Sequence, residues 1–295
     1  MASAIASTAA ASGSTRVAVV TGANKGIGFC IAQQLVASEQ FGRVILACRN
    51  ERLAQEAAGK LGLGASTVTV ECAPLDLGDP NSVDAFAAHV RSAAVGRLDV
   101  LVNNGAIAFK GSDPTPFRDQ TEPTLRVNYF GTARLTDALL PLLRETGENP
   151  QVVSVASMAG KLGQIKSAEL RGGFASESLT REKLDALVES FAAAVQAGDH
   201  QRKGWGNSNY GFSKLALIAY TKMVAREEQL ARQEGGRFVK VNCCCPGYCA
   251  TDMSSHRGHR SAEDGARNAV ILALQGGGQG ALTGEFIQDY QVGSW

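Results

Sequence analysis

The hydrophobic and polar positions of the chain alternate between short apolar runs and longer segments with helical spacing. Short apolar or β-branched runs predict strands at residues 16–20, 44–47, 67–70, 98–102, 151–155, 238–242 and 285–287. Apolar residues at helical spacing predict helices at residues 27–38, 53–61, 82–94, 125–143, 210–229 and 262–274. Strands that alternate with helices favour an α/β fold with a Rossmann-type, doubly wound parallel sheet.

One long segment, residues 160–205, breaks this alternation between the fifth strand and the helix that begins at residue 210. Thr180 could cap a helix there. The apolar residues after it recur at helical spacing: Leu184, Leu187, Val188, Phe191 and Val195. We therefore expect a helical insertion of about residues 160–205 within a single domain that spans residues 16–295.

The first 15 residues are mostly Ala, Ser and Thr, with no acidic residue and no long apolar core. This composition is not that of a secretory signal and predicts a disordered tail at residues 1–15. A remnant of an organelle-targeting segment is the alternative, although the tail has no Arg before Arg16.

Composition limits the classes of partner. The 295 residues are 44% hydrophobic and 19% charged, with a net charge of +1. A charge near zero gives no reason to expect a nucleic acid or an anionic membrane as partner. No apolar run reaches the roughly 18 residues of a membrane-spanning helix.

The seven cysteines are odd in number, and Cys243, Cys244 and Cys245 are consecutive. Such a set is a poor disulfide framework and indicates a reducing, cytoplasmic location. Together with Cys249, the three also lack the paired spacing of a zinc site, so we expect no metal.

A glycine-rich stretch lies between the first predicted strand and the first predicted helix. Gly22, Gly26 and Gly28 follow the spacing Gly-x3-Gly-x-Gly. Glycine permits a tight turn and lets a pyrophosphate approach the backbone, and the N-terminus of the following helix stabilises its negative charge. The pattern predicts a dinucleotide-binding loop.

Residues near the end of the second strand determine whether such a loop binds NAD or NADP. Arg49 lies 49 − 28 = 21 residues past Gly28, where an NAD enzyme usually carries a carboxylate. Arg49 and Lys25 instead suit a 2′-phosphate, which favours NADP(H), unless both are simply solvated surface charges. Asp76, after the third strand, is a candidate partner of the adenine amine or else a helix cap.

Tyr210 and Lys214 carry the candidate chemistry. Residues at i and i+4 share one helix face. A nearby cation favours the phenolate, so we expect Lys214 to lower the pKa of Tyr210 from its usual value of about 10. Such a tyrosine can pass a proton to a carbonyl oxygen. Ser157, after the fifth strand, could bind that oxygen, or could serve only as a cap or turn residue. These residues predict hydride transfer between a nicotinamide cofactor and a carbonyl group.

In this order, the motifs resemble those of the short-chain dehydrogenase/reductase superfamily: Thr21-Gly22-x3-Gly26-x-Gly28, Asn103-Asn104, Asn128, Ser157, Tyr210-x3-Lys214 and Pro246-Gly247. The resemblance implies that Tyr210 is the general acid in reduction. It implies that Lys214 lowers the pKa of that tyrosine and binds the nicotinamide ribose, that Ser157 orients the carbonyl, and that Asn128 holds a water in a proton relay. The cofactor-binding residues that it implies are Gly22, Asn24, Lys25, Gly26, Ile27, Gly28, Arg49, Asp76, Leu77, Asn104, Tyr210, Lys214, Pro246, Gly247 and Thr251.

Within the superfamily the chain is most similar to the monomeric NADPH-dependent carbonyl reductases. The gap of 210 − 157 = 53 residues between Ser157 and Tyr210 matches their helical insertion, which covers the surface used for tetramer formation elsewhere. This resemblance implies a monomer that reduces ketones, aldehydes or quinones. The substrate residues that it implies are Phe109, Lys110, Gln120, Ser157 and Tyr248. The chain differs from the family at Gly105-Ala106, where the order is usually Ala-Gly, at Ala156, which is usually Ser, and at Tyr248, which is usually Trp.

Two alternatives remain open at this point. Plant reductases of monoterpenoid and alkaloid ketones have a similar insertion. A non-catalytic NADPH-binding redox sensor, with Cys243, Cys244 and Cys245 as its switch, is a hypothesis of another class.

Overall fold

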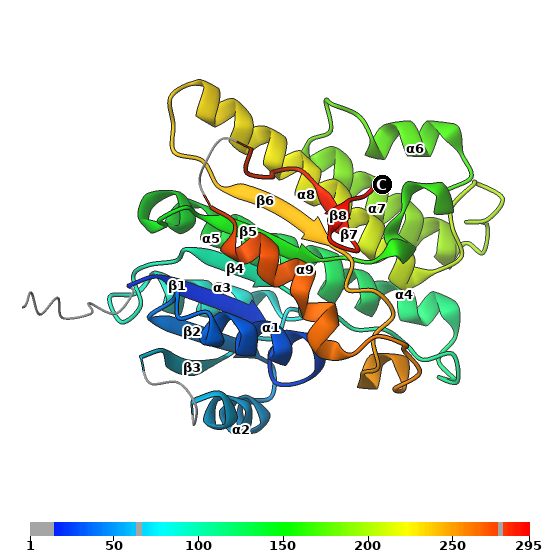
Figure 1. Cartoon of the computed structure of the whole chain (residues 1–295). Helices are drawn as coiled ribbons and strands as arrows, with labels where there is room; N and C mark the ends of the chain where they lie inside the picture. The colour runs from blue at the N-terminus through cyan, green and yellow to red at the C-terminus, as the bar shows by residue number, and fades with distance from the viewer. Residues whose placement is uncertain (1–14, 63–66, 277–279) are drawn as a thin grey trace, which may run out of the picture.

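A central sheet of eight strands is formed within the part of the chain that the computed structural model describes, residues 15–62, 67–276 and 280–295 (Figure 1). The strand order is β3-β2-β1-β4-β5-β6-β7-β8. Neighbouring strands are parallel except for β7 and β8. The predicted Rossmann-type, doubly wound sheet is thus confirmed. The strands are β1 Val17–Thr21, β2 Arg43–Cys48, β3 Thr69–Pro74, β4 Val100–Asn103, β5 Gln151–Val155, β6 Lys240–Cys244, β7 Phe286–Gln288 and β8 Gln291–Val292.

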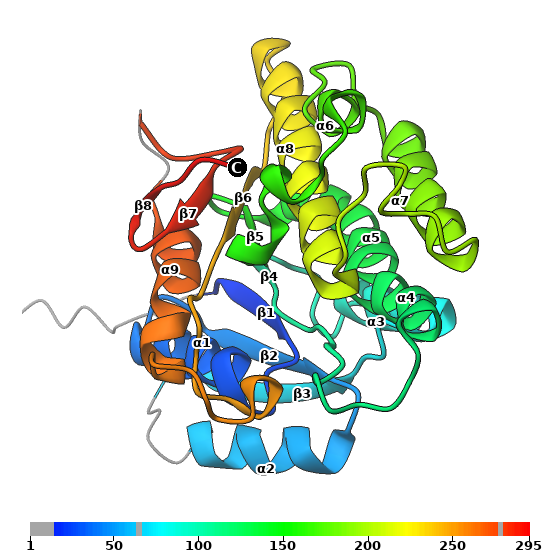
Figure 2. The same ribbon diagram turned by 90° about the vertical axis from the view of Figure 1, so that its right-hand side faces the viewer.

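Helices cover both faces of this sheet (Figures 1 and 2). The helices α1, α2 and α9 pack on one face, and α3, α4, α5 and α8 pack on the other. Because side chains of a strand alternate between faces, Val17 and Val19 enter one core while Ala18 and Val20 enter the other. The helices are α1 Gly26–Ala37, α2 Glu51–Gly62, α3 Pro80–Arg91, α4 Phe117–Leu125, α5 Thr132–Thr146, α6 Ala168–Phe174, α7 Arg181–Gln196, α8 Asn209–Gln233 and α9 Ala262–Leu274.

The helix predicted at residues 125–143 begins earlier and is not uniform. The α4 helix starts at Phe117, a π-helix η1 follows at Arg126–Gly131, and α5 continues to Thr146. Sequence spacing missed α4 because its buried face is polar: Thr121 and Thr124 are buried, and both hydroxyls donate to backbone carbonyls one turn earlier.

The helix predicted within residues 160–205 is present as α7. The Thr180 hydroxyl accepts a hydrogen bond from the backbone N–H of Lys183, as expected for its N-cap. Leu184, Val188, Phe191 and Val195 are buried, and Leu187 is half-buried. The α7 helix packs against α4 and α8 of the same chain. The short helices η2 (Met158–Gly160), η3 (Leu162–Gln164) and α6 precede it.

Polar contacts fix α7 to the surface beneath it. The Tyr129 hydroxyl donates to Asp185 at 2.6 Å, and the Tyr220 hydroxyl donates to Asp137 at 2.5 Å. The Arg181 guanidinium pairs with both carboxylates. It also lies 5.8 Å and 5.4 Å from the centres of the Tyr129 and Tyr220 rings.

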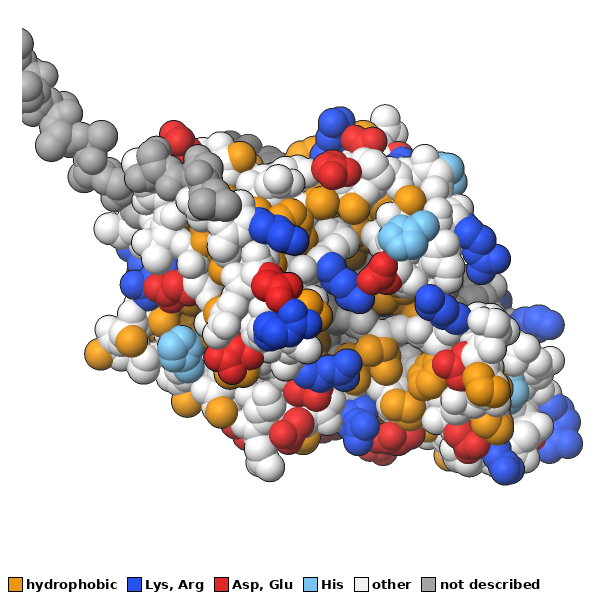
Figure 3. All heavy atoms as spheres, turned by 90° about the horizontal axis from the view of Figure 1, so that it is seen from below, with side chains coloured by type: hydrophobic (Ala, Val, Ile, Leu, Met, Phe, Trp, Pro, Cys, Tyr) orange, Lys and Arg blue, Asp and Glu red, His pale blue; other side chains and the backbone are white. Residues whose placement is uncertain are grey.

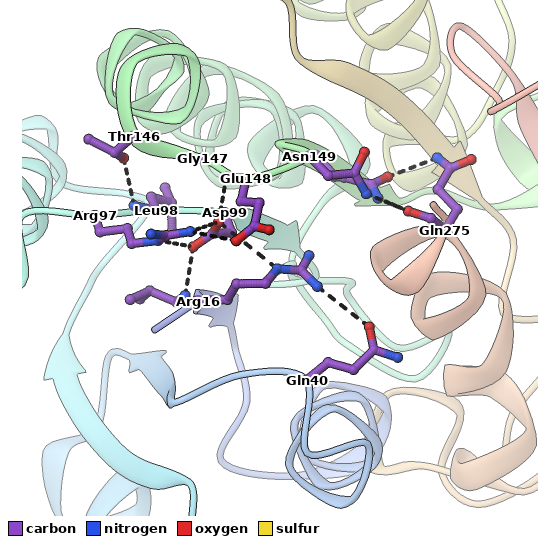
Figure 4. A network of polar contacts seen from close by, with 12 residues as sticks. Arg16, Gln40, Arg97, Leu98, Asp99, Thr146, Gly147, Glu148, Asn149 and Gln275 are labelled. Carbon is purple, nitrogen blue, oxygen red and sulfur yellow. Dashed lines mark hydrogen bonds and ion pairs between the residues drawn. The ribbon is translucent and has the colours of Figure 1, made fainter. Parts of the chain in front are cut away.

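Asp99 connects neighbouring strands at the end of the sheet where the strands begin (Figure 4). Its fully buried carboxylate accepts from the backbone N–H groups of Val17 at 2.8 Å and Glu148 at 2.6 Å. Arg97 binds the same carboxylate with two hydrogen bonds of 2.9 Å. The amino ends of β1, β4 and β5 are thereby held together, which sets where their carboxyl ends meet.

The surface seen in Figure 3 carries acidic and basic side chains intermixed, with apolar side chains in small groups among them. Within residues 15–62, 67–276 and 280–295, no helix is both long and apolar enough to cross a membrane. Over the same residues, no group of three or more His, Cys, Asp and Glu side chains could hold a metal ion. The predicted tail, residues 1–15, lies outside the described residues except for its last residue.

Candidate active site

The predicted catalytic residues gather beyond the carboxyl ends of the central strands. Ser157 follows β5, and its hydroxyl accepts from the backbone N–H of Ala159 at 3.1 Å. Tyr210 lies in the first turn of α8, which is capped by the Ser208 hydroxyl through the N–H of Gly211. The Ser157 side chain lies near Tyr210, close enough to lower the pKa of its phenol.

Lys214 lies one turn further along α8 and is almost fully buried. Its ammonium donates to the carbonyl of Val155 at 2.7 Å and lies 5.7 Å from the centre of the Tyr210 ring. Gly160 makes this packing possible, because a Cβ there would stand 2.7 Å from the carbonyl carbon of Lys214. The turn that carries Ser157 is therefore pressed against the helix that carries Tyr210 and Lys214.

The expectation that Lys214 lowers the pKa of Tyr210 is wrong for this arrangement. Burial raises the pKa of Tyr210 from 10.0 to about 12, and Cys245 adds to the rise while Ser157 opposes it. Burial also lowers the pKa of Lys214 from 10.5 to about 8. Desolvation disfavours the charged form of both groups, and burial is the largest cause of each shift.

Asn128 lies in the π-helix η1 and is buried. Its amide oxygen accepts from the N–H of Ile107 at 2.8 Å. Its amide nitrogen donates to the carbonyl of Ile107 at 2.9 Å and to the hydroxyl of Ser213 at 3.0 Å. Both side-chain donors are used, so Asn128 ties the loop after β4 to α8. The relay water predicted at this residue stays a prediction.

The glycine loop has the geometry of an anion cradle. Gly22 and Gly26 adopt positive φ angles of 63° and 55°, which favour glycine. A Cβ on Gly28 would stand 2.4 Å from both the carbonyl oxygen of Gly22 and the side-chain nitrogen of Asn104. Lys25 occupies the N-cap of α1 and makes no side-chain cap there, and the first turn of that helix has no acidic residue. The N-terminal N–H groups of α1 thus suit a bound pyrophosphate.

Arg49 is exposed directly after β2, beside the glycine loop that follows β1. Lys25 pairs with Asp252 at 2.6 Å. Asp76 is half-buried after β3, and its carboxylate accepts from the N–H of Gly78 at 2.8 Å. The cap of α3 is Asp79, so the alternative that Asp76 caps this helix is wrong. Its neighbour Leu77 is buried.

The Pro246-Gly247 turn follows β6 and begins the loop that carries Thr251. Gly247 has a φ of 81°, and Arg260 donates to the carbonyl of Pro246 at 3.2 Å. Thr251 is half-buried and caps the short helix η4, Asp252–Ser254. Its side chain lies 3.5 Å from where a Cβ on Gly26 would stand. The loop and the glycine turn therefore face each other across the cradle.

The other predicted substrate residues lie on the loops after β4 and β6 and on α4, and two of them are exposed. Phe109 is half-buried and Lys110 is exposed on the loop after β4. Gln120 on α4 donates to the carbonyl of Thr115 at 2.7 Å and so holds that loop. Tyr248 is 49% exposed, with its ring 6.1 Å from the ring of His259.

Two residues of the site have roles that sequence reasoning missed. The Thr21 hydroxyl accepts from the backbone N–H groups of Asn104 at 3.0 Å and Gly105 at 2.8 Å. The Cys245 sulfur accepts from the N–H groups of Met158 and Gly247, each at 3.3 Å. No spacing along the chain reveals the contacts of Thr21 with Asn104 and Gly105 or of Cys245 with Met158, because each joins the ends of different strands.

Comparison with known proteins identifies the family. A family model described as short chain dehydrogenase matches residues 16–169 and 192–262. The chain belongs to the short-chain dehydrogenase family. The unmatched stretch between the two matches falls within the predicted insertion and holds much of α7.

Relatives within the family are similar over nearly the whole chain. Carbonyl reductase [NADPH] 1 of Mus musculus is 40% identical over 96% of this chain and 100% of its own length. The Homo sapiens protein of that name is 38% identical, over 95% of this chain and 98% of its own. Among solved structures, salutaridine reductase from Papaver somniferum has a TM-score of 0.78 and 28% identity, covering 93% of this chain and 99% of its own. Menthone neomenthol reductase from Mentha piperita has a TM-score of 0.73 and 30% identity, covering 92% and 98%.

Proposed function

We propose that this protein is an NADPH-dependent carbonyl reductase that reduces ketones, aldehydes or quinones. The observation that carries the proposal is the grouping of the Ser157 and Tyr210 side chains, with the Lys214 ammonium 5.7 Å from the centre of the Tyr210 ring and bonded to the carbonyl of Val155. Two hydroxyls that meet at the carboxyl edge of a doubly wound sheet can both point to one carbonyl oxygen. The similarity to two NADPH-dependent carbonyl reductases supports the same reaction.

The roles of the side chains follow from their bonds. Ser157 donates a hydrogen bond to the substrate carbonyl oxygen and orients it. Tyr210 transfers its proton to that oxygen as negative charge develops there. Lys214 stabilises the resulting phenolate and reaches the nicotinamide ribose. Asn128 keeps α8 in register with the loop after β4 through Ser213 and Ile107.

The cofactor, when bound, supplies the hydride. The glycine cradle fits its pyrophosphate, because open N–H groups and positive-φ glycines meet at the start of α1. We assign Arg49 to the 2′-phosphate, since this guanidinium is exposed directly after β2. We place the remaining predicted cofactor residues along the same edge: Asn24, Ile27, Asp76, Leu77, Asn104, Pro246, Gly247 and Thr251.

The substrate has a specific alternative. The similarity to salutaridine reductase and menthone neomenthol reductase favours a plant-type alkaloid or monoterpenoid ketone as the second candidate. The redox-sensor hypothesis has less support. Cys243 and Cys244 are buried, and burial raises the pKa of each thiol, which disfavours the reactive thiolate.

We further propose a single-domain monomer located in the cytoplasm. The packing of α7 on α4 and α8, with Arg181 between two carboxylates, supports an insertion that covers its own subunit. All seven cysteines are free, which supports a reducing compartment. Analytical ultracentrifugation at micromolar concentration should give one species near 30.9 kDa. A stable dimer or tetramer would contradict the monomer.

Turnover of NADPH with a simple quinone, followed by its absorbance, tests the reaction. A panel of quinones, aromatic ketones and monoterpenoid ketones then separates the two substrate classes. Tyr210→Phe removes only the donated proton, so it should reduce turnover by roughly 10²–10⁴-fold while NADPH still binds. Near-normal turnover of this variant would disprove the mechanism.

A further inference from the structure

An ion pair crosses the cofactor cradle. The carboxylate of Asp252 lies 2.6 Å from the ammonium of Lys25, although the two residues are 227 positions apart. Lys25 belongs to the glycine loop, and Asp252 directly follows Thr251, whose side chain faces Gly26. Both side chains are more than half exposed, at 64% and 57%. The pair is therefore open to any anion that enters the cradle.

The Asp252 carboxylate is held in this place by a constrained turn. Its second oxygen lies 3.0 Å from the ring nitrogen Nε2 of His256. Ser255 and His256 both have positive φ angles, 52° and 57°, which are uncommon for residues other than glycine. The backbone N–H of His256 donates to the carbonyl of Thr251 at 2.8 Å and closes the turn. The two positive φ angles and this hydrogen bond together define the turn that carries Asp252.

We propose that Asp252 is a specificity-determining residue for the cofactor, which competes with the 2′-phosphate of NADPH for Lys25. The inference rests on the proposed NADPH binding. A phosphate is a stronger partner than one carboxylate, because it carries up to two charges and three acceptor oxygens. Lys25 exchanges Asp252 for the phosphate when NADPH enters, and the protein loses the Lys25–Asp252 pair at that moment. NADH has no 2′-phosphate to compete for the ammonium, so Asp252 lowers the preference for NADPH over NADH.

The size of the effect follows from the exposure of the pair. Exposed ion pairs contribute little, so the loss of this pair weakens binding by at most about fivefold. Asp252→Asn removes the charge and keeps the shape of the side chain. It should tighten NADPH binding by up to about fivefold and leave the dissociation constant of NADH unchanged.

Isothermal titration calorimetry of the full chain with NADPH and with NADH tests this without turnover. If the unmodified protein does not bind NADPH, the proposed function fails before the inference is reached. Asp84→Asn is the matched control, because Asp84 forms a similarly exposed 2.6 Å pair with Arg134 between α3 and α5. This control should leave both dissociation constants unchanged.

A second pair of variants, made in a protein without the Lys25 ammonium, distinguishes competition for Lys25 from simple repulsion of the phosphate by Asp252. Lys25→Met removes the contested ammonium, so adding Asp252→Asn to it should change NADPH affinity by less than about 1.5-fold. The same gain in both backgrounds would mean that Asp252 only repels anions, which would overturn the proposal. If Asp252→Asn bound NADPH more weakly, Asp252 would instead position Lys25 for the phosphate. If Asp252→Asn tightened the binding of NADH as much as that of NADPH, Lys25 would instead bind the pyrophosphate. Either result overturns it as well.

Discussion

Replacing Lys214 by methionine should make the stability of the protein less dependent on pH. Lys214 is buried, and its pKa is lowered from 10.5 to about 8, mainly by desolvation. The difference, 10.5 − 8 or about 2.5, corresponds to about 3 kcal/mol, since one pKa unit is worth about 1.4 kcal/mol. This is the cost of keeping the ammonium charged inside the folded protein at neutral pH.

The sign follows from which state binds more protons. Between pH 8 and 10.5 the unfolded chain keeps this proton while the folded protein loses it, so the stability of the unmodified protein rises with pH. The cost is fully present below pH 8 and disappears as the pH passes through 10.5. The stability difference between Lys214→Met and the unmodified protein should therefore move by about 2 kcal/mol, to the disadvantage of the variant, from pH 7 to pH 10.

Urea unfolding of both proteins at pH 7, 8, 9 and 10 measures this difference. Altered packing and the Val155 carbonyl, which loses its donor, shift the whole curve by an amount that does not depend on pH. The exposed Lys60 on α2 provides the control Lys60→Met, since an ammonium in water pays no desolvation cost. A difference that stays flat, or that moves in favour of the variant as the pH rises, would refute the reasoning.

Three further predictions concern catalysis, cofactor choice and the fold. The kcat/KM of reduction should fall above about pH 8, because Lys214 loses its proton there while Tyr210, with a pKa of about 12, stays protonated. A pH–rate profile that is level to pH 10 would contradict this. Arg49→Asp should shift preference towards NADH, because a carboxylate repels the 2′-phosphate and accepts ribose hydroxyls; an unchanged ratio of kcat/KM for the two cofactors would show that Arg49 does not read the phosphate. Asp99→Ala should lower the free energy of unfolding by about 2–5 kcal/mol, because two buried backbone N–H groups lose their acceptor; a loss below about 1 kcal/mol in urea unfolding would argue against this role.

The sheet could be predicted from sequence because its central strands are buried on both faces. The apolar runs of β1, β2, β4 and β5 stand out against polar loops, and β5 was placed at its observed bounds. The edge strand β3 is less buried, so its run of residues was placed too early. Helix α7 could be predicted for a different reason, because apolar residues at helical spacing form one continuous buried face.

The catalytic helix could also be predicted, because a spacing of four residues fixes Tyr210 and Lys214 on one face. The surroundings of Asn128 could not. A π-helix depends on a local change of hydrogen-bond register, and no apolar period marks it. Contacts such as that of Thr21 with the turn after β4 also depend on strand order, which no residue of β1 encodes by itself.

The raised pKa of Tyr210 changes how the site is understood. The sequence shows the charge of Lys214 but not the burial of either side chain, and burial acts on both groups at once. With a pKa of about 12, only about one phenol in 10⁵ is ionised at pH 7. Tyr210 is then a donor that keeps its proton until a substrate oxygen gains negative charge. Oxidation of an alcohol would need the rare phenolate as base.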